Sequence, residues 1–326
     1  MSDAYIADCV VQIGELRDFV NTYKNSNLNI IKIMEKICDT PFIDFDIYNV
    51  FEIQDLRHDI TDMEVKGTEL ILEMYKEIIV YLVIVYEGFE AHITQMAEHW
   101  VNYVRRFDRT LEDALRLSIK ATMQNMYKCV HGDGTMAPAP LIKMNLYLTG
   151  LDVTYLPSQN EVVHSFSTVL EGIIIIMETI PRIFEKFSLP AMGLKRFCDV
   201  IRVDPDSNKL QVLIDQEVQY NIGLIHNHIR MWEPYSSIWK VNKDEFLIKY
   251  REENHPAADF EALIINYGDL AHHVQVQETL NQIHFITLNS SNLKKSIIAH
   301  CMRWQVVLGE LLRKITEFDI DTVYAY

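Results

Sequence analysis

Residues 68–88 read TELILEMYKEIIVYLVIVYEG, and this stretch sets the class of the fold. One face of it carries apolar residues at helical spacing, namely Leu70, Met74, Ile78, Tyr81 and Val85. The nine apolar residues 78–86 are bounded by glutamates, whereas a bilayer span needs about 20. The stretch therefore predicts the buried core of a helix over about 49–107, which Gly67 and Gly88 interrupt only weakly.

The whole chain shares this helical bias, because residues that break helices are scarce. Its 326 residues include 11 glycines and 9 prolines, and hydrophobic residues make up 49% of them. This fraction is enough to bury a core and excludes global disorder. No internal repeat of fixed period is present, although a regular solenoid would require one. We therefore expect a mostly α fold, arranged as an elongated array of tandem irregular helical bundles.

Two further helices are predicted in the first part of the chain. Three-to-four spacing of apolar residues indicates an amphipathic helix over 4–36, broken near Asn25-Ser26-Asn27. Thr110 is a candidate N-cap for a helix over about 111–129. The glycine-rich sequence His131-Gly132-Asp133-Gly134 provides a strong stop for this helix.

The pattern then changes to a period of two. Two short β-rich runs around Gly150 predict a hairpin near residues 142–156. Helical spacing resumes over about 159–187, where Pro181 should kink or end the helix. A poorly patterned connector occupies residues 188–206.

The remaining segment is again mainly helical. Helices are predicted over residues 208–229, 232–250, 257–273 and 293–318, and the second of them starts afresh after Pro234. A short strand is predicted near residues 283–288. From these patterns and the resemblance given below we expect four parts. Residues 1–107 should form an N-terminal bundle, and residues 108–187 should form helices with a hairpin. Residues 188–230 should form a connector with a helix, and residues 231–326 should form a C-terminal bundle.

Charge and cysteine spacing restrict the class of protein. The formal net charge of −16 argues against binding to nucleic acid, to an anionic membrane or to an acidic filament surface. The five cysteines lie far apart without a CxxC pair, as expected of reduced thiols in the cytoplasm. The N-terminal residues Met1-Ser2-Asp3-Ala4-Tyr5 lack the features of a secretory signal, which also favours a cytoplasmic protein.

No catalytic, cofactor-binding or metal-binding residues are predicted. The motifs GxxxxGK[ST], GxSxG and HExxH are absent from the sequence. The histidine pairs His226/His228 and His272/His273 are too close along the chain to share a helix face. Glu69 and Glu73 lie four residues apart and indicate a solvated helix face.

Aromatic residues in the last third of the chain are the candidate interaction residues. Five large aromatic residues recur at helical spacing, namely Trp232, Tyr235, Trp239, Phe246 and Tyr250. Trp304, further along the chain, is a sixth candidate. Such a cluster packs in a core or anchors a partner, because Trp and Tyr dominate the energetics of interfaces. Both interpretations stay open from the sequence.

Several motifs resemble a known family. They are WEPY at 232–235, IWKVNKDEF at 238–246, QETL at 277–280, IHFITL at 283–288, NLK at 292–294, and His300-Cys301 with Trp304-Gln305. Further matches are LEDALRLSIK at 111–120, HGD at 131–133, PLIK at 140–143 and IPR at 180–182. From about residue 105 to the C-terminus, this set resembles the tail of axonemal dynein heavy chains just ahead of the linker. It is most similar to the beta heavy chain of the two-headed inner-arm dynein.

The resemblance implies a non-catalytic tail segment of a ciliary or flagellar motor. Such a segment consists of stacked helical bundles that transmit force, pair with a second heavy chain and receive intermediate and light chains. The linker, ATPase ring, stalk and microtubule-binding tip of the family have no counterpart in these residues. We therefore expect no cofactor and no direct microtubule contact, and a location in the cytoplasm, in the cytoskeleton of the axoneme.

Two alternatives belong to other classes of protein. The chain could be a generic cytosolic helical scaffold, for example a motor-less paralogue of the dynein tail outside any axonemal complex. It could also be an enzyme, which specific ATP hydrolysis abolished by one pocket mutation would reveal.

Overall fold

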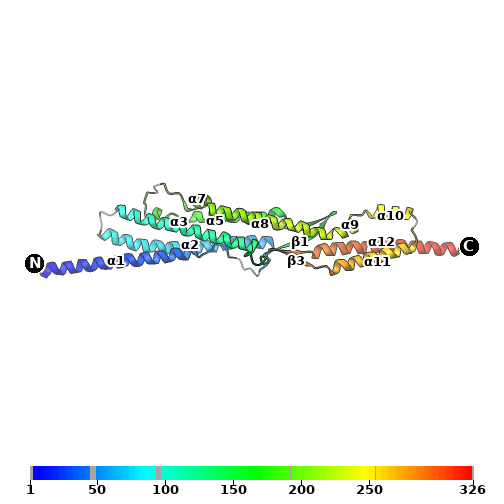
Figure 1. The fold of residues 1–326 in the computed structure, drawn as a ribbon, viewed down its shortest axis with the longest axis horizontal. Helices are drawn as coiled ribbons and strands as arrows, with labels where there is room; N and C mark the ends of the chain where they lie inside the picture. The colour runs from blue at the N-terminus through cyan, green and yellow to red at the C-terminus, as the bar shows by residue number, and fades with distance from the viewer. Residues whose placement is uncertain (1–2, 45–48, 93–96, 191–192, 254, 325–326) are drawn as a thin grey trace. The chain divides into compact units, whose positions relative to one another are not determined.

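The computed structural model describes residues 3–44, 49–92, 97–190, 193–253 and 255–324. The chain divides into two compact units (Figure 1). Unit 1 comprises residues 1–46, 54–132 and 164–216, and unit 2 comprises residues 47–53, 133–163 and 217–326. Each unit is therefore assembled from segments that are distant in the sequence. The mostly α fold predicted from the sequence is confirmed.

Unit 1 is built on three long helices, α1 (Asp3–Cys38), α2 (Ile53–His92) and α3 (Ala97–His131). Of the stripe predicted in the opening stretch, Met74, Ile78 and Val85 are buried in the core of this unit, whereas Leu70 is 41% exposed and Tyr81 is only half-buried. The buried face of α2 is completed instead by Ile71 and Leu82, which the prediction did not include. The remaining elements of unit 1 are short, namely α5 (Val169–Ile176), η1 (Met177–Thr179), α6 (Ile183–Lys186) and α7 (Phe197–Arg202). Two helices, α4 (Gln159–Ser167) and α8 (Pro205–Ile229), belong partly to each unit.

Unit 2 contains a small mixed sheet with strand order β2-β1-β4-β3. Its strands are β1 (Ile142–Thr149), β2 (Asp152–Leu156), β3 (Leu280–Ile283) and β4 (Ile286–Asn289). The hairpin β1–β2 confirms the prediction for residues 142–156, and Gly150 supplies the positive φ of 64° that its turn requires. Strand β1 also pairs in parallel with β4, so that Met144 lies opposite Leu288.

The remaining elements of unit 2 are helical, and the last of them packs against strand β1 of the sheet. They are η2 (Arg230–Tyr235), α9 (Ser237–Lys240), α10 (Lys243–Glu252), α11 (Ala257–Val276) and α12 (Ser291–Tyr324). Helices α11 and α12 run side by side (Figure 1). The buried stripe of α12 consists of Leu293, Ile297, Cys301, Trp304 and Leu308. Helix α12 packs on α11, α9 and strand β1.

Three predictions of helix extent in the N-terminal part are wrong. The helix α1 is not broken at Asn25-Ser26-Asn27, because Ser26 is buried and the Asn27 side chain accepts a hydrogen bond of 2.5 Å from the Tyr103 hydroxyl. Thr110 does not cap a helix but lies within α3, where its hydroxyl donates to the carbonyl of Arg106. The predicted single helix over 49–107 corresponds to two helices, because α2 ends at His92 and α3 begins at Ala97. The stop at residues 131–134 is confirmed.

Three further differences follow from polar side chains and backbone conformation. The predicted helix over 159–187 is already interrupted at Thr168, whose hydroxyl bonds to the carbonyl of His164, and it ends before Pro181 as expected. The helix predicted over 232–250, with a fresh start after Pro234, is divided into η2, α9 and α10. Pro234 lies inside η2, and the extended backbone of Val241 (ψ of 128°) separates α9 from α10. The strand predicted near residues 283–288 is confirmed for residues 286–288, which belong to β4. A turn at residues 284–285, with His284 at a φ of 50°, separates them from Ile283 at the end of β3.

Residues 159–186 are long and apolar enough for a membrane span by composition alone, as the only such stretch among the residues described. In the fold this stretch is divided into four short elements, and its residues Phe166, Ile173 and Met177 are buried. Their burial within the folded chain matches that of a core segment.

Candidate functional site

The six candidate aromatic residues lie at three separate places in unit 2. Phe246, Tyr250 and Trp304 form one cluster, in which the Phe246 ring stacks on Tyr250 at 5.4 Å and meets Trp304 edge-on at 5.2 Å. The indole of Trp304 is fully buried, and its Nε1 donates a hydrogen bond of 2.8 Å to the carbonyl of Ile238. These contacts hold α10, α12 and α9 together.

The sequence analysis missed several members of this cluster. Tyr267 of α11 stacks on Trp304 at 5.3 Å, and Phe260 meets Tyr250 edge-on at 4.8 Å. The ammonium of Lys243 lies 5.3 Å from the centre of the Trp304 ring. Phe260 and Tyr267 belong to α11, so helical spacing along residues 232–250 could not indicate that they pack against this cluster.

Trp239 lies apart from that cluster. Its ring is 7% exposed, and its Nε1 donates a hydrogen bond of 3.0 Å to the carbonyl of Leu151 in the β1–β2 turn. Since Leu151 lies 88 residues earlier in the chain, this bond ties helix α9 to the hairpin. Trp239 is therefore an anchor within unit 2.

Trp232 and Tyr235 line a cavity of about 560 Å³ at the end of α8 and η2. The Trp232 ring is 5% exposed, and its Nε1 has no hydrogen-bond acceptor among the residues that the structure describes. Burial lowers the pKa of His228, which also lines the cavity. A buried indole N–H without an acceptor costs free energy relative to one that is hydrogen-bonded.

Lys294 of the NLK motif has a structural role that the sequence did not reveal. Its ammonium donates hydrogen bonds of 3.0 Å and 2.6 Å to the carbonyls of Gln275 and Gln277, and one of 3.1 Å to the Thr279 hydroxyl. The first two acceptors lie at the C-terminal end of α11, where carbonyls lack intrahelical partners and a positive charge is favoured. Lys294 thus caps α11 from α12.

Unit 1 contains a buried ion-pair network around Arg182, the last residue of the IPR motif. Arg182 is 1% exposed, and its guanidinium donates 2.8 Å and 2.5 Å hydrogen bonds to the carboxylates of Asp108 and Glu112 on α3. It also bonds to the carbonyl of Lys195 and lies 4.0 Å from the centre of the Phe197 ring. Burial raises the pKa of Asp108, and the Arg182 guanidinium opposes this effect.

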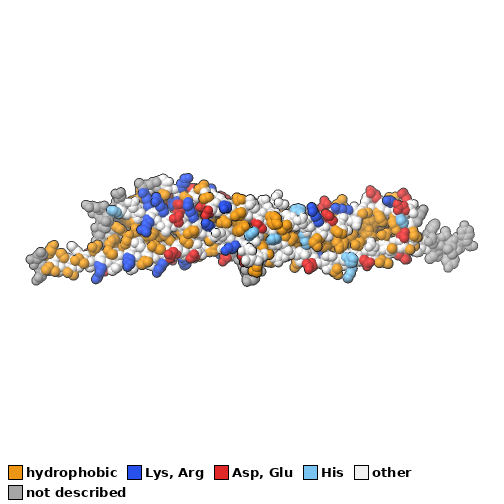
Figure 2. Space-filling view, in the orientation of Figure 1, with side chains coloured by type: hydrophobic (Ala, Val, Ile, Leu, Met, Phe, Trp, Pro, Cys, Tyr) orange, Lys and Arg blue, Asp and Glu red, His pale blue; other side chains and the backbone are white. Residues whose placement is uncertain are grey.

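An exposed apolar stripe follows the N-terminal half of α1. Its members recur at helical spacing and are each more than half exposed, namely Ile6 (53%), Val10 (64%), Ile13 (67%), Leu16 (57%) and Val20 (52%). Figure 1 shows this part of α1 extending beyond α2 and α3, and Figure 2 shows hydrophobic side chains along it. We call these five residues the α1 stripe. Further along α1, Ile30, Met34 and Ile37 are buried in unit 1.

Within the described parts of the chain, no three His, Cys, Asp or Glu side chains lie close enough together to hold a metal ion. Of the five cysteines, which the sequence predicts to be core thiols, only Cys198 and Cys301 are buried, and the other three are half-buried. Glu69 and Glu73 are exposed on α2, as the sequence predicted.

No family model matches the chain, but curated relatives do. Dynein axonemal heavy chain 2 of Homo sapiens is 27% identical over 331 residues, which cover 99% of this chain and 7% of that protein. The dynein-1-beta heavy chain of the flagellar inner arm I1 complex of Chlamydomonas reinhardtii is 20% identical over 94% of this chain. The alpha heavy chain of that complex is 18% identical over 82%. This chain spans about 7% of the length of the first two relatives.

Proposed function

The chain belongs to the axonemal dynein heavy-chain family, and from this premise we propose that it is a non-catalytic structural segment of the dynein tail. Homology to these chains implies a cytoskeletal location in the axoneme of cilia or flagella. In this proposal the segment assembles with other dynein subunits and transmits force during microtubule-based movement. Its partners are a second heavy chain, intermediate chains and light chains.

The observation that carries the assembly role is the α1 stripe. A helix that is apolar along one face but uncovered there normally packs on another helix. The same helix buries its later apolar residues against α3, so the stripe continues an existing packing face. The occupant that fits best is an amphipathic helix of a partner dynein chain. The net charge of −16 would steer approach of a basic partner.

The role in force transmission is supported by the internal ties of each unit. In unit 1, the Arg182 network links α3 to the segment around α6 and to residue 195. In unit 2, Trp239 links α9 to the hairpin and Lys294 links α12 to α11. Bonds between distant segments resist shear better than contacts within one helix, because they must break together.

The test is recovery of dynein subunits from solubilised axonemes with the purified chain as bait. We expect identified heavy or intermediate chains to bind, and a triple variant of the stripe (Ile6→Ser, Val10→Ser, Ile13→Ser) to lose them. A matched control replaces three exposed apolar residues elsewhere in unit 1, Val65, Val80 and Leu117, by serine and should retain binding. Failure of the unmodified chain to recover any dynein subunit would count against the proposal.

The alternative of a generic helical scaffold makes a different prediction about location. A scaffold outside axonemal complexes would stay in the cell body, whereas a tail segment enters the axoneme. Immunolocalisation of the endogenous protein in ciliated cells distinguishes the two. An ATPase role has no support from the sequence motifs, and purified chain without specific ATP hydrolysis would agree with the structural role.

A further inference from the structure

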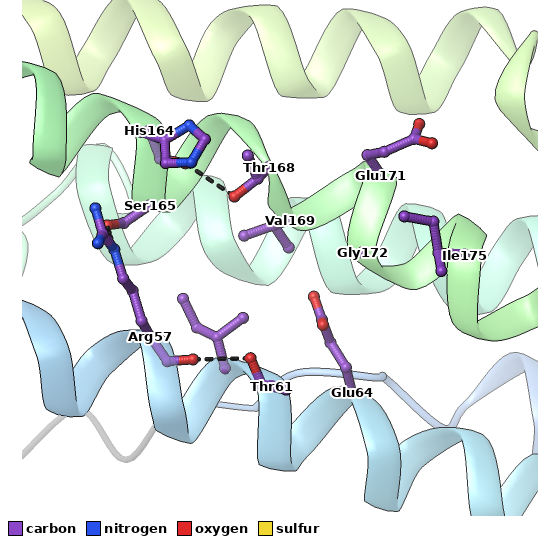
Figure 3. Close-up of a pocket in the computed structure, with 11 residues that line it drawn as sticks. Arg57, Thr61, Glu64, His164, Ser165, Thr168, Val169, Glu171, Gly172 and Ile175 are labelled. Atoms are coloured by element: carbon purple, nitrogen blue, oxygen red, sulfur yellow. Dashed lines mark hydrogen bonds between the residues drawn. The ribbon is translucent and has the colours of Figure 1, made fainter.

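Unit 1 contains a cavity of about 410 Å³ between α2 and the α4–α5 segment (Figure 3). Its walls combine apolar side chains, among them Ile60, Val169 and Ile175, with a few polar groups. Ligand sites have this composition, in which apolar walls surround a small number of placed polar groups.

Glu64 of α2 is the unusual residue of this cavity. Its side chain is 5% exposed, and its carboxylate has no hydrogen-bond or ion-pair partner among the residues described. Figure 3 shows the carboxyl pointing from α2 toward Gly172 of α5. A buried carboxyl without a partner is costly, and such groups in native proteins usually mark a ligand or a function.

Gly172 provides the space for this carboxyl. A Cβ atom at Gly172 would lie 2.8 Å and 2.9 Å from the two carboxylate oxygens of Glu64, closer than real Cβ contacts. The glycine therefore lets an acid reach into the cavity. Burial raises the pKa of Glu64 to about 7, so the group is close to half ionised at neutral pH.

Two other charged side chains at the cavity, Arg57 and Glu171, interact with residues other than Glu64. Arg57 donates a hydrogen bond of 2.6 Å to the Ser165 hydroxyl, and Glu171 forms an ion pair of 2.9 Å with Arg202 of α7. The imidazole of His164 is the remaining titratable group on the lining. The hydroxyls of Thr61 and Thr168 donate to carbonyls of their own helices. Glu64 thus remains available for a cationic ligand.

We propose that this cavity binds an alkylammonium ion, a primary amine on an aliphatic stem. The ammonium would contact the Glu64 carboxylate, and the stem would lie along Ile60, Val169 and Ile175. A compact ammonium with three donors suits a single carboxylate. Two sources carry this chemistry, a lysine side chain of a partner protein and a free small amine. The inference goes beyond the proposed function and does not rest on it.

The test is calorimetric or NMR titration of the full chain with two probes, n-butylammonium and Nα-acetyl-lysine amide. We expect saturable binding that becomes about tenfold tighter from pH 6 to pH 8, because Glu64 gains its charge over this range. Neutral n-butanol should bind much more weakly to the unmodified chain. Tighter binding of the lysine probe would identify a partner lysine as the source, and tighter binding of n-butylammonium would identify a free amine.

Two variants complete the experiment. Glu64→Gln keeps the shape of the side chain and should abolish binding of both probes, whereas Glu69→Gln, on the exposed face of α2, should leave it unchanged. Equal binding of ammonium and n-butanol, equal binding by Glu64→Gln, or no binding at millimolar probe would each overturn the proposal. Because the comparison of n-butylammonium with n-butanol uses the unmodified chain, it tests the need for a positive charge on the ligand even if a variant does not fold.

Discussion

At the scale of single residues, buried charges have the largest consequences. Arg182 and Asp108 are almost completely buried, and each satisfies the other. The Asp108 carboxylate also accepts a hydrogen bond of 2.8 Å from the backbone N–H of Ile183, at the start of α6. The carboxylate therefore fixes both the guanidinium and the turn that carries it.

The variant Arg182→Met should destabilise unit 1 by about 3–5 kcal/mol, because it leaves the Asp108 charge buried without its partner. Arg196→Met is the matched control, since Arg196 forms an exposed pair with Asp199 and should have little effect. Urea unfolding followed by hydrogen exchange of the backbone amides of α3 measures both. An equal shift of the unfolding midpoint in the two variants would show that the buried network is not a stabilising tie.

Glu64 should make the stability of the chain depend on pH. Its pKa in the fold is about 7, above the ordinary value of 4.5, so the folded chain binds the extra proton between these values. The contribution of this group to the free energy of unfolding therefore has its full value below pH 4.5. It decreases as the pH rises from 4.5 to 7 and does not change further above pH 7. Allowing for solvent that reaches the cavity, the loss is about 2 kcal/mol.

Unfolding free energies at pH 5 and pH 8 test this expectation. The difference between the two pH values should be smaller in Glu64→Gln than in the unmodified chain, whereas Glu69→Gln should keep the full difference. If Glu64→Gln retained the full difference, another group would carry the pH dependence.

At the scale of elements, the packing of α2 depends on a close approach. A Cβ atom at Gly67 would lie 2.9 Å from the Cα of Phe42, in the segment that follows α1. That segment cannot easily move, because the Phe42 N–H donates a 2.8 Å hydrogen bond to Thr122 of α3 and the Thr40 carbonyl accepts one from Ser118. Gly67 is thus a packing residue, although the sequence indicated only a weak interruption of the helix.

Gly67→Ala should destabilise the chain by about 1–3 kcal/mol through this overlap. Gly14→Ala in α1 is the opposite case, because a Cβ there meets nothing within 4 Å and alanine favours helix by about 0.5–1 kcal/mol. Thermal unfolding monitored by circular dichroism compares the two substitutions, which should shift the melting temperature in opposite directions. A stabilising Gly67→Ala would mean that α2 and Phe42 do not approach so closely.

At the scale of the whole molecule, segments far apart in sequence complete each unit. Strands β1 and β4 pair in parallel although about 140 residues separate them, and the Asn289 amide donates a 2.9 Å hydrogen bond to the Asn145 side chain. Strand β4 also pairs with β3, so it is an inner strand of the sheet. A substitution that weakens the packing of β4 should therefore also destabilise β1.

Leu288→Ala should cost about 2–5 kcal/mol, because Leu288 is fully buried in β4. Leu280→Ala in β3 is the control, since Leu280 is 60% exposed and should change stability little. Amide hydrogen exchange should become faster in β1 as well as in β3 and β4 of the first variant. Unchanged exchange in β1 would indicate that the parallel pairing contributes little to its stability.

The sequence by itself determined the features that depend on neighbouring residues. Apolar periodicity predicted the helical class, and the glycines at 132, 134 and 150 marked a helix end and a hairpin turn, because both signals act within a few residues. The quoted motifs also led to the family that the comparisons support.

Only the tertiary structure decided which local signals prevailed. Asn27 stays helical because Tyr103 satisfies its side chain, and Thr110 continues α3 although it resembles a cap. The partner of Trp304 in α11, the pairing of β1 with β4 and the glycine opposite Glu64 come from distant segments. Periodicity along one helix or strand shows which face is apolar, but it cannot specify the distant residue that packs against that face.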